Sequence, residues 1–280
     1  MTLKIAVVQP TTNAPPDDEL NVADAVRYVE RAAAEGAEFV AFPESYPGPW
    51  RMPTTYDPTP AMVEVAQRCG VYVQFGTLEP IDEAEGTAYN LAVLAYPSGA
   101  EPGRYRRTYP PGPWSYPGGK FWDFQYVAGD EYPVFDTEQA AVGLGMCSEV
   151  YMPEVTRALA LRGAELIFLP AGVNKRMLWA SWRNLIWARA IENLAVVVTT
   201  QNIFSPDEKG LAMVATPEEI LFESTEPGLF VVTVDIDRAR ELRGLTDNRE
   251  SSLHNAAKAG VLSQWQRPEL ADVILHGASD

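Results

Sequence analysis

The chain alternates short β-branched runs with longer segments of helical periodicity, and this alternation constrains its fold more than any other feature. Residues 3–9 (LKIAVVQ) predict a buried strand, and residues 18–38 then repeat apolar positions at helical spacing, with Gly36 at a helix C-cap. This order continues along most of the chain and predicts an α/β fold. Further predicted strands are 38–44, 71–79, 141–146, 164–172, 195–202, 211–215, 219–223 and 229–235, and further predicted helices are 61–70, 152–162 and 178–193.

The sequence shows neither a linker nor a repeat, so we expect one domain over residues 1–280. From about residue 248 the hydrophobic pattern is mixed and fits neither a helix nor a strand clearly. We treat this part as a C-terminal tail that is a candidate for packing on a partner subunit. The net charge of −16, from 22 basic and 38 acidic residues, argues against nucleic acid and anionic membrane as partners.

Two further features bear on the compartment. No apolar stretch approaches the roughly 20 residues of a membrane span, and the apolar part of the N-terminus is too short for a signal peptide. Cys69 and Cys147 lie far apart, which argues against a disulfide framework. We therefore expect a cytoplasmic protein with reduced thiols.

Residues 109–130 form a predicted loop rich in proline, glycine and aromatic side chains. A loop of this length in a compact domain is usually functional or disordered, and its aromatic content favours function. Aromatic candidates for the mouth of a pocket are Trp114, Tyr116, Trp122, Phe124 and Tyr126 in this loop, and Trp179 and Trp182 in the later helix.

Cys147 follows one predicted strand and precedes one predicted helix, within VGLGMCSEVYMPEV. At such a turn the free N–H groups of the helix favour a thiolate and can stabilise an oxyanion. The pattern alone also fits a small buried residue, so both interpretations remain open here. No motif for a serine hydrolase, a nucleotide-binding loop or a metal centre is present, and we predict neither metal nor cofactor.

A nucleophilic cysteine needs a base. The two histidines, His254 and His276, both lie in the final segment. A carboxylate can serve instead when a pocket of low polarity raises its pKa. Glu44 ends the apolar strand VAFPE and is placed for that role.

Four blocks, taken together, resemble the carbon–nitrogen hydrolase (nitrilase) superfamily. They are AFPES, GRYRRTYPP, GMCSEVYMPEVTRALALRGAELIFLPAG and WRNLIWARAIENLAVVVTTQN, and the resemblance runs from the first strand to about residue 240. It implies a four-layer α-β-β-α sandwich, a homo-oligomer built on a dimer, and a Cys-Glu-Lys triad. Glu44 matches the general base, Cys147 matches the nucleophile, and the N–H of Ser148 would meet the oxyanion.

The chain departs from this family pattern at the lysine. Arg107 occupies the expected position in Tyr105-Arg106-Arg107-Thr108-Tyr109, and the second glutamate of many amidases is absent from 113–119. Arginine supplies a fixed charge and a donor, but it cannot shuttle a proton. Three interpretations follow: a working variant with Arg107, a variant that recruits Lys120 or Lys175, or an inactive homologue.

The resemblance to this family also bears on the substrate. Nitrilases commonly carry Trp after the nucleophile, and Ser148 therefore favours an amide, whereas the aromatic loop favours an apolar or aromatic acyl group. A nitrile or an N-carbamoyl compound bound through Arg176 is the alternative, and a non-catalytic ligand-binding protein is the alternative of another class. Asn174 is a candidate for the pocket edge, and Glu149 for lining the pocket or pairing with Arg107.

Overall fold

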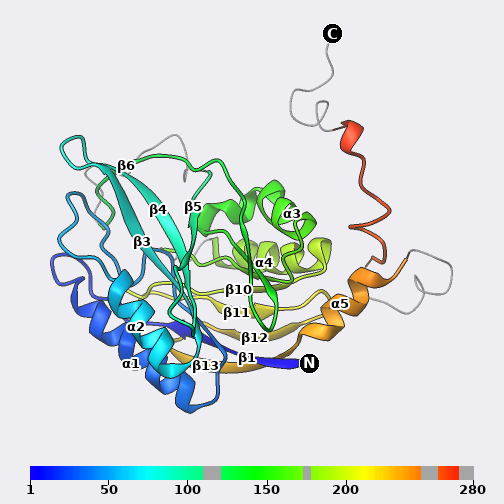
Figure 1. The fold of residues 1–280 in the computed structure, drawn as a ribbon, viewed down its shortest axis with the longest axis horizontal. Coiled ribbons are helices and arrows are strands. Elements are labelled where there is room, and N and C mark those ends of the chain that lie inside the picture. Colours follow the sequence, from blue (N-terminus) through cyan, green and yellow to red (C-terminus); the bar gives the residue numbers. More distant parts are fainter. Residues whose placement is uncertain (110–120, 173–177, 247–257, 271–280) are drawn as a thin grey trace, which may run out of the picture.

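Two β-sheets face each other in the centre of the molecule, and helices cover both outer faces (Figure 1). The structure is a computed structural model that describes residues 1–109, 121–172, 178–246 and 258–270. The four-layer α-β-β-α arrangement implied by the sequence resemblance is confirmed.

The first sheet has seven strands. They are β1 (Thr2–Gln9), β2 (Phe39–Ala41), β3 (Tyr72–Asp82), β4 (Thr87–Ala95), β5 (Gly103–Arg106), β6 (Gln125–Tyr126) and β13 (Gly228–Asp235). Their order is β13-β1-β2-β3-β4-β5, with β6 paired to β4. β1, β2 and β3 run parallel, whereas β13 and β4 pair antiparallel with β1 and β3 at either side.

The second sheet repeats this layout with six strands. They are β7 (Val134–Asp136), β8 (Ala141–Leu144), β9 (Leu166–Phe168), β10 (Val196–Thr199), β11 (Ala212–Ala215) and β12 (Ile220–Ser224). Their order is β12-β11-β10-β9-β8-β7, and β8, β9 and β10 run parallel. Both sheets thus have parallel strands at the centre, and the carboxyl ends of such strands are where α/β proteins bind ligands.

The helices pack on the outer faces through their apolar stripes. Those on the first sheet are α1 (Leu20–Ala34) and α2 (Thr59–Cys69), and those on the second are α3 (Pro153–Leu161) and α4 (Trp179–Asn193). A 3₁₀ helix, η1 (Cys147–Tyr151), precedes α3, while α5 (Ile236–Gly244) directly follows β13 of the first sheet and η4 (Pro268–Leu270) lies further along the chain. Gly36 and Gly70 have φ of +82° and +68° after α1 and α2, as the predicted C-caps require.

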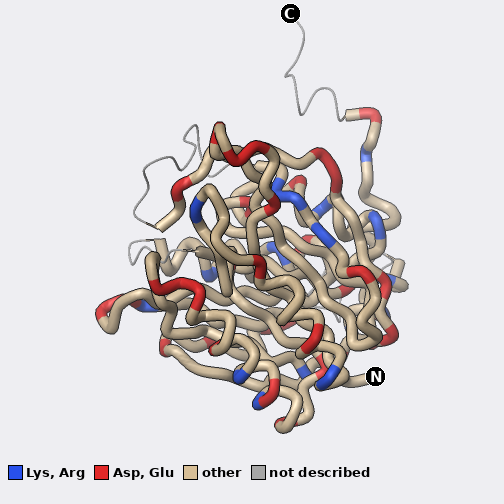
Figure 2. Tube along the Cα trace, turned by 60° about the vertical axis from the view of Figure 1, so that its left-hand side comes forward, with Lys and Arg blue, Asp and Glu red and all other residues tan. Residues whose placement is uncertain are grey.

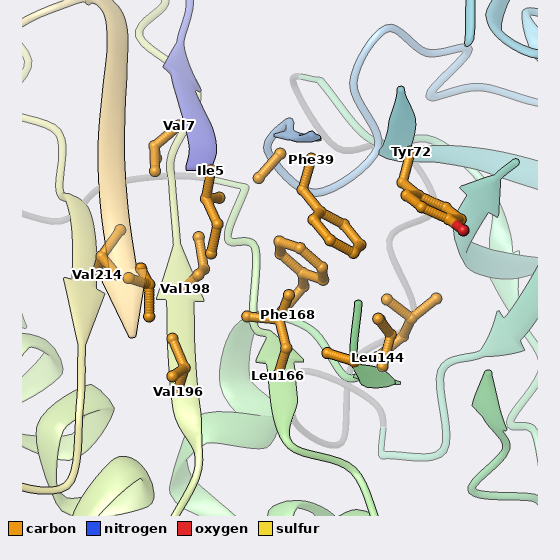
Figure 3. Packing of buried hydrophobic residues seen from close by; sticks show 14 of the residues in the cluster. Ile5, Val7, Phe39, Tyr72, Leu144, Leu166, Phe168, Val196, Val198 and Val214 are labelled. Atoms are coloured by element: carbon orange, nitrogen blue, oxygen red, sulfur yellow. The ribbon is translucent and has the colours of Figure 1, made fainter. Parts of the chain in front are cut away.

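The main core lies between the two sheets (Figure 3). Ile5 and Val7 of β1 face Val198 of β10 across this layer, and Phe39 of β2 meets Phe168 of β9 with ring centroids 6.3 Å apart. These residues come from the β-branched and aromatic runs that predicted strands. Continuous burial on both faces explains why the central strands show few polar residues.

Some elements differ from the sequence prediction. The strand predicted at 164–172 is regular only over Leu166–Phe168, although Leu169 and Ala171 still donate to Val198 O and Thr200 O and Ala171 forms an isolated parallel bridge with Gln201. The predicted loop 109–130 contains β6 and packs Trp122 and Phe124 into a buried aromatic cluster. Acidic and basic residues are scattered along the described chain, and the acidic positions are the more numerous (Figure 2). No described helix is long and apolar enough to cross a membrane.

Candidate active site

Three side chains singled out by the sequence follow the ends of three strands and meet between the sheets. Glu44 lies just after β2, Arg107 directly follows β5, and Cys147 lies just after β8. The guanidinium of Arg107 and the carboxylate of Glu44 form an ion pair, and Cys147 interacts with both of them. Glu44 and Cys147, which are more than a hundred positions apart in the sequence, are therefore brought together by the packing of the two sheets face to face.

The ion pair is completely enclosed. Arg107 Nη1 donates to Glu44 Oε1 at 2.8 Å, and the exposed fractions of the two side chains are 0% and 2%. Asn90 Nδ2 donates to the same carboxylate oxygen at 3.1 Å. A buried charge is costly unless it is paired and hydrogen-bonded, and here each charge compensates the other.

The remaining nitrogens of Arg107 also have hydrogen-bond partners. Its Nη2 donates to Ser148 Oγ at 2.5 Å, and its Nε donates to the carbonyl of Tyr109 at 2.8 Å. The Tyr126 ring lies 5.9 Å from the guanidinium carbon. The planar fork of arginine suits this set of contacts, since one lysine amine cannot reach acceptors in three separate directions.

Cys147 is the first residue of η1 and has a φ of +51°. This left-handed conformation is uncommon for a residue with a side chain, and such residues cluster at functional sites. The backbone N–H of Cys147 donates to Pro170 O at 2.6 Å, which ties the turn to the end of β9. The residue as a whole keeps part of its surface exposed, whereas its sulfur lies in an enclosed environment.

The pKa of the Cys147 thiol is raised, which favours its protonated form at neutral pH. Desolvation raises its pKa to about 12, and the negative charge and hydrogen bond of Glu44 act in the same direction. Arg107 and the backbone N–H of Gly172 lower this pKa but do not outweigh burial. Burial therefore opposes the thiolate that the sequence interpretation expects from the turn after Cys147, where η1 leads into α3.

Gly172 closes the space beside the thiol. A Cβ placed on this residue would lie 2.6 Å from Glu44 Oε2 and 2.7 Å from Trp122 Cζ2. Trp122 Nε1 donates to Ser45 Oγ at 3.3 Å, so the indole of the predicted aromatic loop lies beside the carboxylate. Trp182 belongs to the core cluster between α4 and the second sheet.

Several residues predicted from the sequence lie outside the described part of the chain. They are Trp114, Tyr116, Lys120, Asn174, Lys175 and Arg176. The carboxylate of Glu149 is buried and accepts from Tyr105 OH, while the place at Arg107 considered for it is taken by Glu44. Within the described residues, no group of three or more His, Cys, Asp or Glu side chains could hold a metal ion.

Sequence reasoning missed two asparagines that hold Glu44. Asn90 binds its carboxylate from β4, and Asn202 Nδ2 donates to the Glu44 carbonyl at 3.0 Å. Both are fully buried. A signal was present for each, since Asn90 interrupts the apolar run AYNLAVLA and Asn202 ends a predicted buried strand. A polar residue in such a run needs a partner.

Comparison with known sequences places the chain in a family. The family model for carbon-nitrogen hydrolases matches residues 4–243. A deaminated glutathione amidase from Synechocystis is 28% identical over 241 residues, which cover 80% of this chain and 89% of that protein. A human omega-amidase is 26% identical over 265 residues, which cover 86% and 92%.

Solved structures share the fold. A carbon-nitrogen hydrolase from Helicobacter pylori G27 matches with a TM-score of 0.76 at 18% identity, over 98% of this chain and 99% of that one. A mutant of an amidase from Nesterenkonia sp., with the acetamide moiety of fluoroacetamide added covalently at its active-site cysteine, matches with a TM-score of 0.69. It is 23% identical over 90% of this chain and 95% of that one.

Proposed function

Because the chain belongs to the carbon-nitrogen hydrolase family, we propose that it is an amidase that forms a thioester on Cys147. The observation that carries this proposal is the position of Glu44, which pairs with Arg107 and hydrogen-bonds to the Cys147 thiol. The relatives named as amidases and the cysteine adduct of the Nesterenkonia amidase support the same chemistry. The substrate we propose is the amide of a small apolar or aromatic acid.

The first half of the reaction transfers the acyl group. Glu44 takes the proton of the Cys147 thiol as the sulfur attacks the amide carbon, because a thiol with a pKa near 12 needs a base. The carbonyl oxygen becomes an oxyanion, which meets the N–H of Ser148 and the positive charge of Arg107. Glu44 then gives the proton to the leaving nitrogen, and ammonia departs from a thioester.

The second half consumes water. Glu44 takes a proton from a water molecule, the resulting hydroxide attacks the thioester carbon, and the proton returns to the departing sulfur. The acid is released and the thiol is restored. Since Arg107 stays charged at every accessible pH, all proton transfers in this scheme go through Glu44.

A screen of amides, nitriles and N-carbamoyl compounds for ammonia release tests this proposal. We expect amides to be turned over and the mass of the protein to increase by one acyl group at Cys147 during turnover. Cys147→Ala should lose turnover, whereas Cys69→Ala should retain it, because Cys69 lies in α2 with a partly buried thiol. Absence of both turnover and adduct would favour the non-catalytic homologue.

A location in the cytoplasm remains part of this proposal. Both Cys69 and Cys147 carry free thiols, as a reducing compartment would preserve them. A reducing compartment would also protect Cys147 from oxidation, which would abolish its nucleophilicity. Fractionation of the source cells with antibodies to the protein would test this location.

A further inference from the structure

We propose that Glu149 is a positioning residue that sets the distance between the Arg107 guanidinium and the Cys147 thiol. This inference rests on the proposed function, because it concerns how that site is held together. Glu149 lies two residues after Cys147, and its side chain has an exposed fraction of 0%. A buried carboxylate of this kind needs a full set of donors.

The two oxygens of Glu149 have separate partners. Oε2 accepts from the backbone N–H of Met146, the residue before Cys147, at 2.8 Å. Oε1 accepts from the hydroxyl of Tyr105 at 2.6 Å. It also accepts from Thr108 N and Thr108 Oγ1, both at 2.9 Å, and from Tyr109 N at 3.1 Å.

These partners lie on both sides of the site. Tyr105, Thr108 and Tyr109 flank Arg107 on β5 and the segment after it, in the first sheet, whereas Met146 follows β8 in the second sheet. One carboxylate therefore joins the chain around the cation to the chain around the nucleophile. Because Arg107 Nε donates to the carbonyl of Tyr109, a shift of Tyr109 also moves the guanidinium.

Only a carboxylate of this length satisfies the geometry. All five partners of Glu149 are donors, and a carboxylate accepts at both oxygens without donating. Glutamine would turn an N–H₂ group toward one set of donors, and those donors would then have no acceptor. Burial and Glu149 together raise the pKa of Tyr105 well above its usual range, so this hydroxyl remains a donor.

The decisive variants are Glu149→Gln, which keeps the size, and Glu149→Asp, which keeps the charge. Glu154→Gln is the matched control, because Glu154 is an exposed acid in the first turn of α3. We expect Glu149→Gln to lower kcat per folded molecule by ~100-fold with KM changed by less than about threefold, as small displacements of catalytic groups do. Glu149→Asp should recover part of kcat, and Glu154→Gln should match the wild type.

A purely structural role gives a different pattern. The melting temperature of Glu149→Gln would fall while kcat per folded molecule stayed within about threefold of the wild type, and this would overturn the proposal. A rise in KM with unchanged kcat would overturn it as well. If Glu149→Gln does not fold, the same split is measured with Glu149→Asp, which retains the acceptors with a shorter reach.

A second measurement does not depend on turnover. Iodoacetamide alkylates Cys147 and Cys69 in the same molecule, and peptide masses give the rate at Cys147 divided by the rate at Cys69. Arg107 lowers the pKa of Cys147, so displacing it in Glu149→Gln should lower this ratio by about tenfold for each pKa unit. An unchanged ratio would refute the positioning role. If the wild type releases no ammonia but Glu149→Gln still lowers the alkylation ratio, only the proposed amidase activity would be refuted.

Discussion

Glu44 and Gly172 approach so closely that no side chain fits between them, with Glu44 Oε2 2.6 Å from the position of a Cβ on Gly172. The other oxygen, Oε1, is held by Arg107 Nη1 and Asn90 Nδ2. The N–H of Gly172 also hydrogen-bonds to the Cys147 sulfur. We therefore propose that Oε1 anchors the base and that Oε2 carries the proton.

Gly172→Ala tests this division of labour. The added methyl group would displace either Glu44 Oε2 or the Trp122 indole, whose Cζ2 lies 2.7 Å from the same Cβ position. We expect turnover to fall by ~100-fold, since the base would lose its alignment with Cys147. Gly244→Ala is the control, because a Cβ there meets no atom within 4 Å. Equal losses in the two variants would contradict the assignment of Oε2.

Arg107→Ala removes the cation from the buried pair. We expect turnover to fall by at least ~100-fold, the scale of one lost oxyanion donor. The folded protein should also lose about 3–5 kcal/mol of stability, because Glu44 would keep a buried charge without its partner. Ammonia release and denaturant unfolding measure the two effects, and a mild effect on both would point to another cation.

Arg107→Lys separates charge from geometry. Its position in the family pattern suggests that lysine restores activity. The contacts suggest otherwise, because lysine can donate to Glu44 but leaves Ser148 Oγ or Tyr109 O without its donor. We expect turnover of about a tenth of the wild type, a loss near 1.4 kcal/mol in transition-state stabilisation. Activity above the wild type would show that the site accepts the usual triad.

Glu44→Gln should change thiol reactivity and turnover in opposite directions. The charge of Glu44 and its hydrogen bond both raise the pKa of Cys147, so their removal lowers this pKa and increases the thiolate fraction at pH 8. Alkylation of Cys147 should therefore accelerate relative to Cys69, while turnover should fall by at least ~100-fold without its base. Slower alkylation in Glu44→Gln would show that Glu44 does not face the thiol.

The parts of this molecule that follow from local pattern were predictable. Strands and helices follow hydrophobic periodicity, and Glu44 and Cys147 come at the ends of apolar strands within recognisable motifs. The role of Asn90 was not predictable, because it depends on the register that pairs Asn90 with Leu78 across β3 and β4. Local pattern carries no information on that register when both strands are buried.

Two other features depend on tertiary structure. The helix α5 has few apolar residues over IDRARELRG, so periodicity does not reveal it, although the Asp235 side chain caps it by accepting from Asp237 N. The pKa of Cys147 depends on enclosure by segments distant in sequence, which reverses the effect expected from a helix N-terminus. Motif spacing locates a nucleophile but does not reveal its protonation state.

Arg243 in α5 provides a stability test away from the site. Its guanidinium donates to the carbonyls of Leu194 at 2.7 Å and Asn193 at 3.2 Å, at the end of α4, and to those of Gly163 and Ala164 after α3. Burial lowers the pKa of Arg243 to about 10. It remains charged at neutral pH and complements both helix C-termini.

Arg243→Ala should therefore destabilise the protein without changing the chemistry. We expect a loss of about 2–4 kcal/mol in the free energy of unfolding, because several carbonyls lose their donor. kcat per folded molecule should remain at the wild-type level. Arg162→Ala, at an exposed position after α3, should change stability by less than about 0.5 kcal/mol. Urea unfolding of both variants makes the comparison.

The outer face of α3 and α4 bears on assembly, and a homodimer remains our proposal. Leu161 is 51% exposed on this face. A second subunit packed on these helices would remove this exposed apolar side chain from water.

Light scattering at micromolar concentration should give at least twice 30.8 kDa for the wild type. Leu161→Glu should shift the mass toward the monomer, because a charge placed in an apolar interface loses its hydration without gaining a partner. Leu20→Glu is the matched control, since Leu20 is 60% exposed on α1, on the opposite outer layer, and should leave the mass unchanged. A monomeric wild type would refute the dimer, whereas a dimer that survives Leu161→Glu but not Leu20→Glu would move the interface to the face formed by α1 and α2.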